Sequence, residues 1–153
     1  MLKEGDPAPD FELRADDGST VKLSGLRGKR VILFFYPKAD TSGCTIEACE
    51  FRDTLPKIAA EDAVVLGVSP DPITELVNFR DKYGLNFRLL ADQDHRVAER
   101  YGVWREKSMY GRVYLGVERT TFVIGEDSRI SRVYERVKPK GHAAAVLADL
   151  EGR

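Results

Sequence analysis

The sequence has little of what usually marks a secreted, membrane-spanning or nucleic-acid-binding protein. Its 153 residues include only two cysteines and two histidines. The 24 basic and 25 acidic residues nearly cancel and form no long block of one sign, so we expect no nucleic-acid or anionic-membrane partner. Residues 1–10 are charged and contain proline, unlike a signal peptide, and no apolar run is long enough to span a bilayer.

The small number of cysteines also indicates the compartment. Two cysteines without a secretion signal favour a reducing compartment, with the cytoplasm as the default, where a cysteine pair is more often reactive than structural. The hydrophobic content of 42% is enough for one ordinary core, and no repeat, low-complexity tract or linker divides the chain. We therefore expect residues 1–153 to form a single domain.

The order of apolar runs predicts alternating strands and helices. Residues 31–35 are apolar on both faces, which is typical of a central buried strand, and a helical pattern from about 43 to 60 follows it, with an expected kink at Pro56. Residues 102–117 show no clean period and are expected to form an aromatic-rich loop. The other expected elements are a hairpin at 10–13 and 20–23, strands at 64–68, 87–90, 120–124 and 130–137, and helices at 73–83, 95–101 and 143–150. This order favours a thioredoxin-like α/β fold, in which a central mixed sheet is flanked by helices.

The most informative stretch is 36–49, because it places Cys44 in the first turn of a helix directly after the buried strand. Unpaired backbone N–H groups and the positive end of the helix dipole favour the thiolate there, and the thiolate is the nucleophilic form. Thr41 or Ser42 can cap the helix, and a hydroxyl three residues before Cys44 can donate to the sulfur. Pro37 ends the strand and shields the site. These features predict a reactive cysteine.

The same residues resemble a known motif. Pro37, Thr41 and Cys44 match Pro-x-x-x-Thr-x-x-Cys, the active-site motif of the peroxiredoxins. The continuation to Cys49 is similar to the bacterioferritin comigratory protein, or peroxiredoxin Q, subfamily, whose members often carry a resolving cysteine five residues further on. The similarity extends over nearly the whole chain, including residues 5–11, 51–53, 102–104 and 119–124.

The resemblance implies an activity and a set of roles. The activity is the reduction of hydrogen peroxide and organic hydroperoxides, in which Cys44 becomes a sulfenic acid and Cys49 condenses with it to form a disulfide. The family's arginine falls on Arg119, and Thr41 and Pro37 complete the site. Glu47 is a secondary candidate, which could support Arg119. Thioredoxin or a similar dithiol protein would reduce the disulfide, without a bound metal or organic cofactor. No third cysteine lies in a C-terminal tail, so we expect a monomer.

Other readings of these residues stay open. Cys49 could be a core residue of the helix while a partner thiol resolves the sulfenic acid. Arg119 could form a surface ion pair with Glu118 or another nearby acid, and Glu47 could be a solvated helical glutamate.

Rival functions fit part of the pattern. A thioredoxin-like reductase would carry Cys-x-x-Cys, whereas four residues separate Cys44 from Cys49. A metal-binding module could hold copper or zinc with both cysteines and His95 or His142, although we expect both histidines to be ordinary surface residues without a role. The glutamine and asparagine pattern of glutathione peroxidases is not found around the cysteine. The aromatic residues Trp104, Tyr110 and Tyr114 could border the pocket, or could pack their loop onto the core.

Helix geometry makes one further prediction. Two residues five apart on a helix have Cα atoms about 8.7 Å apart, whereas a disulfide needs them within about 6.8 Å. If Cys44 and Cys49 share one helix when reduced, its beginning must unwind before they can bond.

Overall fold

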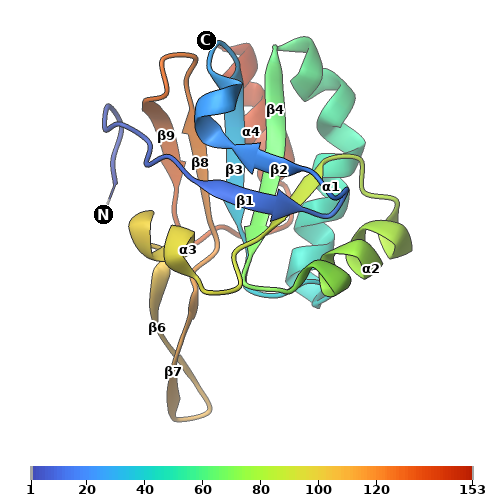
Figure 1. Cartoon of the computed structure of the whole chain (residues 1–153), viewed down its shortest axis with the longest axis vertical. Coiled ribbons are helices and arrows are strands. Elements are labelled where there is room, and N and C mark those ends of the chain that lie inside the picture. The colour runs from blue at the N-terminus through green and yellow to red at the C-terminus, as the bar shows by residue number, and fades with distance from the viewer. Residues whose placement is uncertain (1, 153) are drawn as a thin grey trace.

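A seven-stranded mixed sheet forms the centre of the molecule. The computed structural model describes residues 2–152, and its strands follow the order β2-β1-β5-β4-β3-β8-β9 (Figure 1). β3, β4 and β5 are parallel, while β8 and β9 on one side and the β1–β2 hairpin on the other are antiparallel. The strands are β1 (Glu12–Ala15), β2 (Thr20–Lys22), β3 (Arg30–Phe35), β4 (Ala63–Ser69), β5 (Arg88–Ala91), β8 (Thr120–Ile124) and β9 (Ile130–Tyr134). This confirms the thioredoxin-like α/β fold with an N-terminal hairpin.

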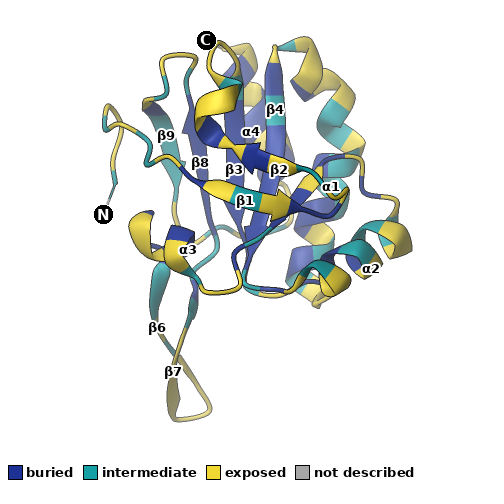
Figure 2. Cartoon of the chain, in the orientation of Figure 1, coloured by how far each residue is buried: buried dark blue, intermediate teal, exposed yellow. Residues whose placement is uncertain are grey.

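Helices cover both faces of this sheet. α1 (Ser42–Ala60), α2 (Ile73–Tyr83) and α4 (His142–Glu151) pack on one face, and α3 (Arg96–Arg100) with the short 3-10 helix η1 (Leu23–Leu26) packs on the other. Figure 2 shows the central strands buried between these layers. The predicted helices all form.

β3 is buried on both faces of the sheet from Val31 to Phe35. Ile32 and Phe34 face α1, α2 and α4, whereas Val31, Leu33 and Phe35 face α3. A strand buried on both faces needs an apolar residue at every position, which is why residues 31–35 form an unbroken apolar run. The prediction of a central strand is confirmed.

Aromatic stacking places α1 over β3. The rings of Phe34 and Phe51 are stacked with centroids 4.9 Å apart, and both side chains are almost fully buried. Gly67 on β4 leaves the space for Phe34, because a Cβ atom there would lie 2.8 Å from the Phe34 ring. α1 continues through Pro56 and carries Cys44 in its first turn, directly after the loop that follows β3.

The expectation of a loop at 102–117 is wrong. The segment forms an antiparallel hairpin of β6 (Trp104–Met109) and β7 (Arg112–Val117), which projects from the body of the molecule (Figure 1). Most of its side chains are exposed, so packing imposes no alternation of apolar and polar residues, and the period of two is missing. Tyr110 and Gly111 at its tip both have positive φ, as a tight two-residue hairpin turn requires.

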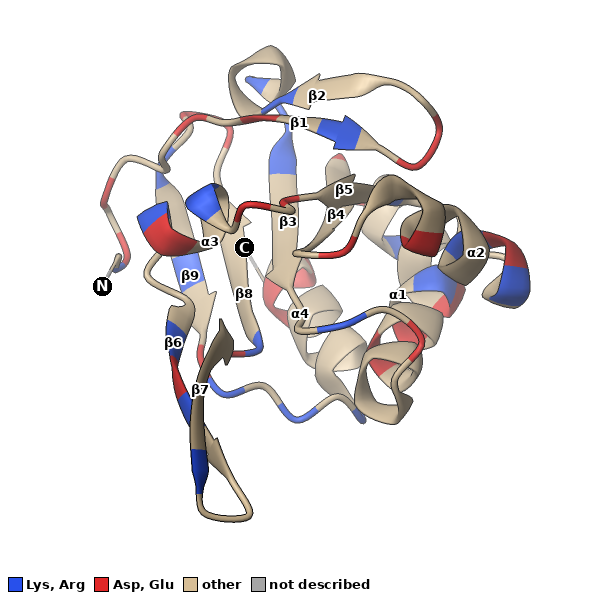
Figure 3. Cartoon of the chain, turned by 60° about the horizontal axis from the view of Figure 1, so that its bottom comes forward, with Lys and Arg blue, Asp and Glu red and all other residues tan. Residues whose placement is uncertain are grey.

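Charged residues of both signs are spread over the helices and strands at the surface, as Figure 3 shows. Within residues 2–152, no helix is both long enough and apolar enough to cross a membrane.

Candidate active site

Cys44 is the third residue of α1 and is only 1% exposed. Thr41 occupies the N-cap position with an extended backbone, and its carbonyl accepts the first helical bond from the N–H of Thr45 at 2.8 Å. Its hydroxyl does not cap the helix, but donates instead to the carbonyl of Lys38 at 2.8 Å. The predicted position of Cys44 at a helix start is therefore correct, whereas the predicted side-chain cap by Thr41 is not formed.

The loop between β3 and α1 is held by side chains that the sequence analysis did not single out. The buried carboxylate of Asp71 accepts hydrogen bonds from the Ala39 N–H at 2.8 Å and from the Ser69 hydroxyl at 2.7 Å. Asp40 has a positive φ of 60°, and its carboxylate binds Lys82 and Tyr83 of α2. These contacts tie the loop containing the half-buried Pro37 to the ends of β4 and α2.

Arg119 brings a positive charge to Cys44 from the junction of β7 and β8. Its Nη2 lies 3.3 Å from the Cys44 Sγ, and its side chain is 15% exposed. Its backbone is held by the Val137 N–H, which donates to the Arg119 carbonyl at 3.0 Å. The alternative of an ion pair with Glu118 is wrong, because Glu118 pairs with Arg105 and Arg136.

Gly43 gives the guanidinium room to lie beside the sulfur. A Cβ atom at this position would lie only 3.1 Å from Arg119 Nη2, closer than most real Cβ contacts, and 3.4 Å from the Pro139 ring. The absence of a side chain at Gly43 therefore helps to determine how closely Arg119 approaches the first turn of α1.

Glu47 is the buried partner of Arg119. Its Oε1 accepts a hydrogen bond from Arg119 Nη1 at 2.7 Å, and the residue is 1% exposed, so the alternative of a solvated glutamate is wrong. Burial raises the pKa of Glu47 to about 7, although the charge and hydrogen bond of Arg119 act in the opposite direction. Its second oxygen, Oε2, has no hydrogen-bond partner among the described residues.

Cys49 lies on the same helix as Cys44, one and a half turns further along. It is half-buried, and both cysteines are free thiols. Because α1 is continuous from Ser42 to Ala60, the condition for the geometric argument is met, and the two sulfurs cannot bond while the helix is intact.

The two histidines are not ordinary surface residues. His142, the first residue of α4, is 6% exposed, and its Nε2 lies 2.8 Å from the Thr121 hydroxyl and 4.0 Å from Glu47 Oε2. Burial, with the charge of Arg119, lowers the pKa of His142 to about 4. His95 is partly exposed and stacks on Trp104 with ring centroids 4.0 Å apart. A histidine beside Gly141 resembles a surface residue in the sequence, and only the packing of α4 against α1 buries it.

The hairpin contributes a lysine rather than its aromatic residues to the surroundings of the site. Tyr110 is 99% exposed at the tip and Tyr114 is 41% exposed, while Trp104 packs on His95. Lys107 donates to the carbonyl of Val117 at 2.8 Å. Burial lowers the pKa of Lys107, and the charge of Arg119 lowers it further.

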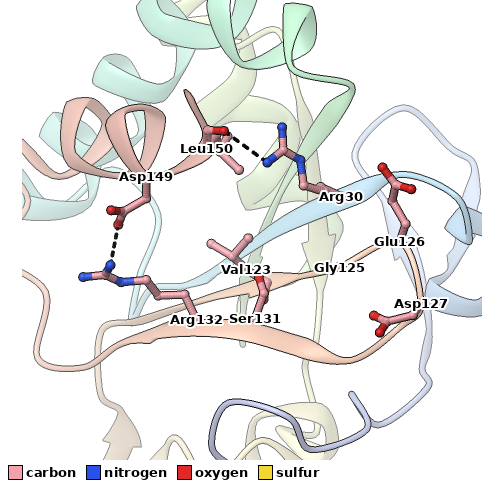
Figure 4. A pocket seen from close by; sticks show the side chains of 9 residues that line it. All are labelled: Arg30, Val123, Gly125, Glu126, Asp127, Ser131, Arg132, Asp149 and Leu150. Atoms are coloured by element: carbon pink, nitrogen blue, oxygen red, sulfur yellow. Dashed lines mark hydrogen bonds and ion pairs between the residues drawn. The ribbon is translucent and has the colours of Figure 1, made fainter. Parts of the chain in front are cut away.

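A separate pocket of about 490 Å³ lies near the beginning of β3 (Figure 4). Cys44 follows the other end of that strand. The two arginines of the pocket are already engaged, since Arg132 pairs with Asp149 at 3.1 Å and Arg30 donates to the Leu150 carbonyl at 3.2 Å. Neither cysteine lines this pocket.

The metal-binding alternative finds no support. In the part of the chain that the structure describes, no group of three or more histidine, cysteine, aspartate or glutamate side chains could hold a metal ion. His142 lies near Glu47 and Thr121 rather than forming such a group with the cysteines.

Sequence comparisons agree with the geometry. Residues 4–133 match the model of the AhpC/TSA family. The chain is 46% identical over 150 residues to Peroxiredoxin Bcp of Bacillus subtilis, covering 98% of this chain and 96% of that protein. It is 44% identical to Peroxiredoxin Bcp of Escherichia coli K12, over 95% of this chain and 94% of the relative.

Solved structures give the same result. A PrxQ variant from Xylella fastidiosa superposes with a TM-score of 0.94 at 34% identity, covering 99% of this chain and 97% of that one. The bacterioferritin comigratory protein of Xanthomonas campestris, which has alkyl peroxide reduction activity, superposes with a TM-score of 0.91 at 35% identity over 99% and 97% of the two chains.

Proposed function

The chain belongs to the AhpC/TSA family as a peroxiredoxin of the Bcp type and is a thiol peroxidase, and from this premise we propose that Cys44 is its peroxidatic residue. The observation that carries the proposal is the approach of Arg119 Nη2 to within 3.3 Å of the buried Cys44 Sγ at the start of α1. A positive group and a helix N-terminus together attract the oxygens of a peroxide and stabilise the negative charge that develops on the leaving oxygen.

In the first step the Cys44 sulfur attacks one peroxide oxygen in line with the O–O bond. An S–O bond forms and the O–O bond breaks, so that two electrons pass from sulfur to oxygen. The leaving oxygen takes a proton and departs as water or an alcohol, and Cys44 becomes a sulfenic acid. Arg119 and the backbone N–H groups near Gly43 stabilise the charge that moves onto the leaving oxygen. In the same proposal Thr41 and Pro37, which lie between β3 and α1, complete the site around Cys44.

In the second step Cys49 attacks the sulfenic sulfur. An S–S bond forms, the S–O bond breaks, and the hydroxyl leaves as water with the proton of the Cys49 thiol. The continuity of α1 means that its first turns unwind before this step, which removes Arg119 from Cys44 until the disulfide is reduced.

The substrates and the reductant follow from the assignment of the chain to the peroxiredoxins. A peroxiredoxin acts on peroxides and is recycled by a thiol reductant, and we propose hydrogen peroxide and organic hydroperoxides as substrates, as the activity of the Xanthomonas campestris relative suggests. We further propose that thioredoxin or a similar dithiol protein reduces the disulfide in the cytoplasm. Both cysteines belong to one chain, so a monomer, formed by a single domain, suffices for the cycle.

The test is a peroxide-consumption assay with thioredoxin, thioredoxin reductase and NADPH, run with hydrogen peroxide and with a bulky organic hydroperoxide. Wild type should consume both, and Cys44→Ser should consume neither while keeping its circular dichroism spectrum, because a hydroxyl is a far poorer nucleophile. Turnover by Cys44→Ser would remove Cys44 from the mechanism. Turnover with a different dithiol protein but not with thioredoxin would change only the reductant.

A further inference from the structure

A line of polar side chains, interrupted between Glu47 and His142, leads away from the Cys44 sulfur into the core. Arg119 lies 3.3 Å from the sulfur, Glu47 lies 2.7 Å from Arg119, His142 lies 4.0 Å from Glu47, and Thr121 lies 2.8 Å from His142. These groups come from α1, α4 and the beginning of β8. Of these four side chains, the proposed peroxide step uses only Arg119. Glu47, His142 and Thr121 therefore need another explanation.

Glu47 is the member of this line whose side chain is only partly held by hydrogen bonds. One of its oxygens is bound to Arg119, but Oε2 is buried and unpaired within residues 2–152, which is unfavourable for a carboxylate. His142 Nε2, at 4.0 Å, approaches that oxygen from α4. A carboxylate with one unpaired oxygen can rotate about its last bonds unless its surroundings restrict it, and rotation would move the guanidinium bound to the other oxygen.

The His142 ring is itself firmly held. Its Nε2 shares a hydrogen bond with the Thr121 hydroxyl, and Thr121 is fully buried. Phe51 and Tyr134 contact the ring edge to face, with centroids 5.7 Å and 5.2 Å away. The ring therefore presents its nitrogen to Glu47 in one orientation.

We propose that His142 is a positioning residue for the peroxide step, which confines Glu47 so that Arg119 presents Nη2 to the Cys44 sulfur. Burial keeps the imidazole neutral at physiological pH, so it acts through its shape and its polar nitrogen rather than through an ion pair. His142 touches neither the sulfur nor a peroxide in this proposal, and its whole effect passes through Glu47. The inference rests on the proposed function of Cys44.

The test compares two replacements of His142 that differ in one property. His142→Phe keeps an aromatic ring between Phe51 and Tyr134 but has no nitrogen, whereas His142→Gln restores a polar nitrogen at about the same reach. The rate of Cys44 oxidation by hydrogen peroxide is measured in a single turnover by rapid quenching and mass spectrometry of the sulfenic acid. We expect His142→Phe to be about tenfold slower than wild type, because even a small misplacement of a group at the reacting centre lowers the rate by this order or more, and His142→Gln to recover most of the rate.

A second arm separates positioning from simple destabilisation. In a Glu47→Gln background, His142→Phe should cause no further loss of rate, because the residue through which it acts has already been changed. Val146→Ala, a buried position on the same helix, should lower the unfolding temperature but leave the rate of the folded protein unchanged.

Each outcome decides the inference. A His142→Phe rate equal to wild type, a His142→Gln rate as low as that of His142→Phe, or losses that multiply in the Glu47→Gln background would each overturn it. A wild-type protein that does not react with peroxide would instead overturn the proposed function of Cys44. The two failures are therefore distinguishable.

Discussion

Arg119 and Glu47 are 72 residues apart in the chain, yet Arg119 Nη1 lies 2.7 Å from Glu47 Oε1 in a pair that is almost closed to solvent. The pair joins the junction of β7 and β8 to the second turn of α1, and the other nitrogen of the guanidinium faces the Cys44 sulfur at 3.3 Å. Local unwinding of α1 would break this pair and separate Arg119 from Cys44 at the same time, because Glu47 lies between the two cysteines on the helix.

Arg119→Lys should slow the reaction of Cys44 with peroxide by about tenfold to a hundredfold. Lysine keeps the positive charge but cannot bind Glu47 and face the sulfur with two nitrogens of one planar group. Single-turnover oxidation with hydrogen peroxide measures the effect. Arg136→Lys is the matched control, since Arg136 is exposed and pairs with Glu118. Equal rates for Arg119→Lys and wild type would exclude a role for the guanidinium fork.

Cys49→Ser should keep the first reaction with peroxide but lose turnover with thioredoxin. Without Cys49, the Cys44 sulfenic acid has no thiol partner on α1, and it persists long enough to be oxidised further to the sulfinic acid. Mass spectrometry after graded additions of peroxide distinguishes these products. Sustained turnover by this variant with thioredoxin would mean that another thiol resolves the sulfenic acid, and Cys49 would then be only a core residue.

Disulfide formation should loosen the start of α1. Amide hydrogen exchange should become faster across residues 41–55 in the oxidised protein, because two helical positions five residues apart cannot be bridged without unwinding. α3, which packs on the opposite face of the sheet, provides an internal reference whose protection should stay the same. Cys49→Ser treated with one equivalent of peroxide provides a second control, because it is oxidised without a disulfide. Unchanged protection of α1 in a protein whose disulfide is confirmed by mass spectrometry would contradict the coupled unwinding.

The buried Glu47 and His142 should make opposite contributions to the pH dependence of stability. Burial raises the pKa of Glu47 from 4.5 to about 7, so the folded state holds the proton more tightly and the contribution of Glu47 falls as pH rises across that range. Burial lowers the pKa of His142 from 6.5 to about 4, so its contribution rises with pH over 4 to 6.5. Each shift changes the free energy of unfolding by about 3 kcal/mol over its pH range. Between pH 4.5 and 6.5 the two contributions have opposite slopes and largely cancel.

Single variants should reveal each contribution. The groups that face the pair are Arg119, which affects both residues, and Glu50, which affects Glu47. Relative to the double variant Glu47→Gln/His142→Phe, the free energy of unfolding of His142→Phe should decrease between pH 4.5 and 7. That of Glu47→Gln should increase between pH 4 and 6.5. Urea unfolding at half-unit pH steps measures both slopes, and parallel curves for all three variants would contradict the assigned ionisations.

The sequence alone determined the features that depend on neighbouring residues. The unbroken apolar run of β3, the helix that follows it and the motif of Pro37, Thr41 and Cys44 are local, and each can be recognised from residues adjacent in the chain. The order of strands and helices also indicated the mixed sheet, because short connections leave few ways to arrange them. The family resemblance selected Arg119, for which the local sequence favoured a surface ion pair.

The tertiary structure decided the features that depend on which elements meet. Glu47 resembles a solvated glutamate and His142 a surface histidine until α1, α4 and β8 pack together and remove both side chains from water. The β6–β7 hairpin was not predicted because its mostly exposed side chains are not sorted by a core. Its strands pair through their backbones, together with the hydrogen bond from the Lys107 side chain to the Val117 carbonyl. Burial and long-range pairing are properties of the assembled fold. They bring Arg119 to Cys44, and they bring Glu47 to Arg119.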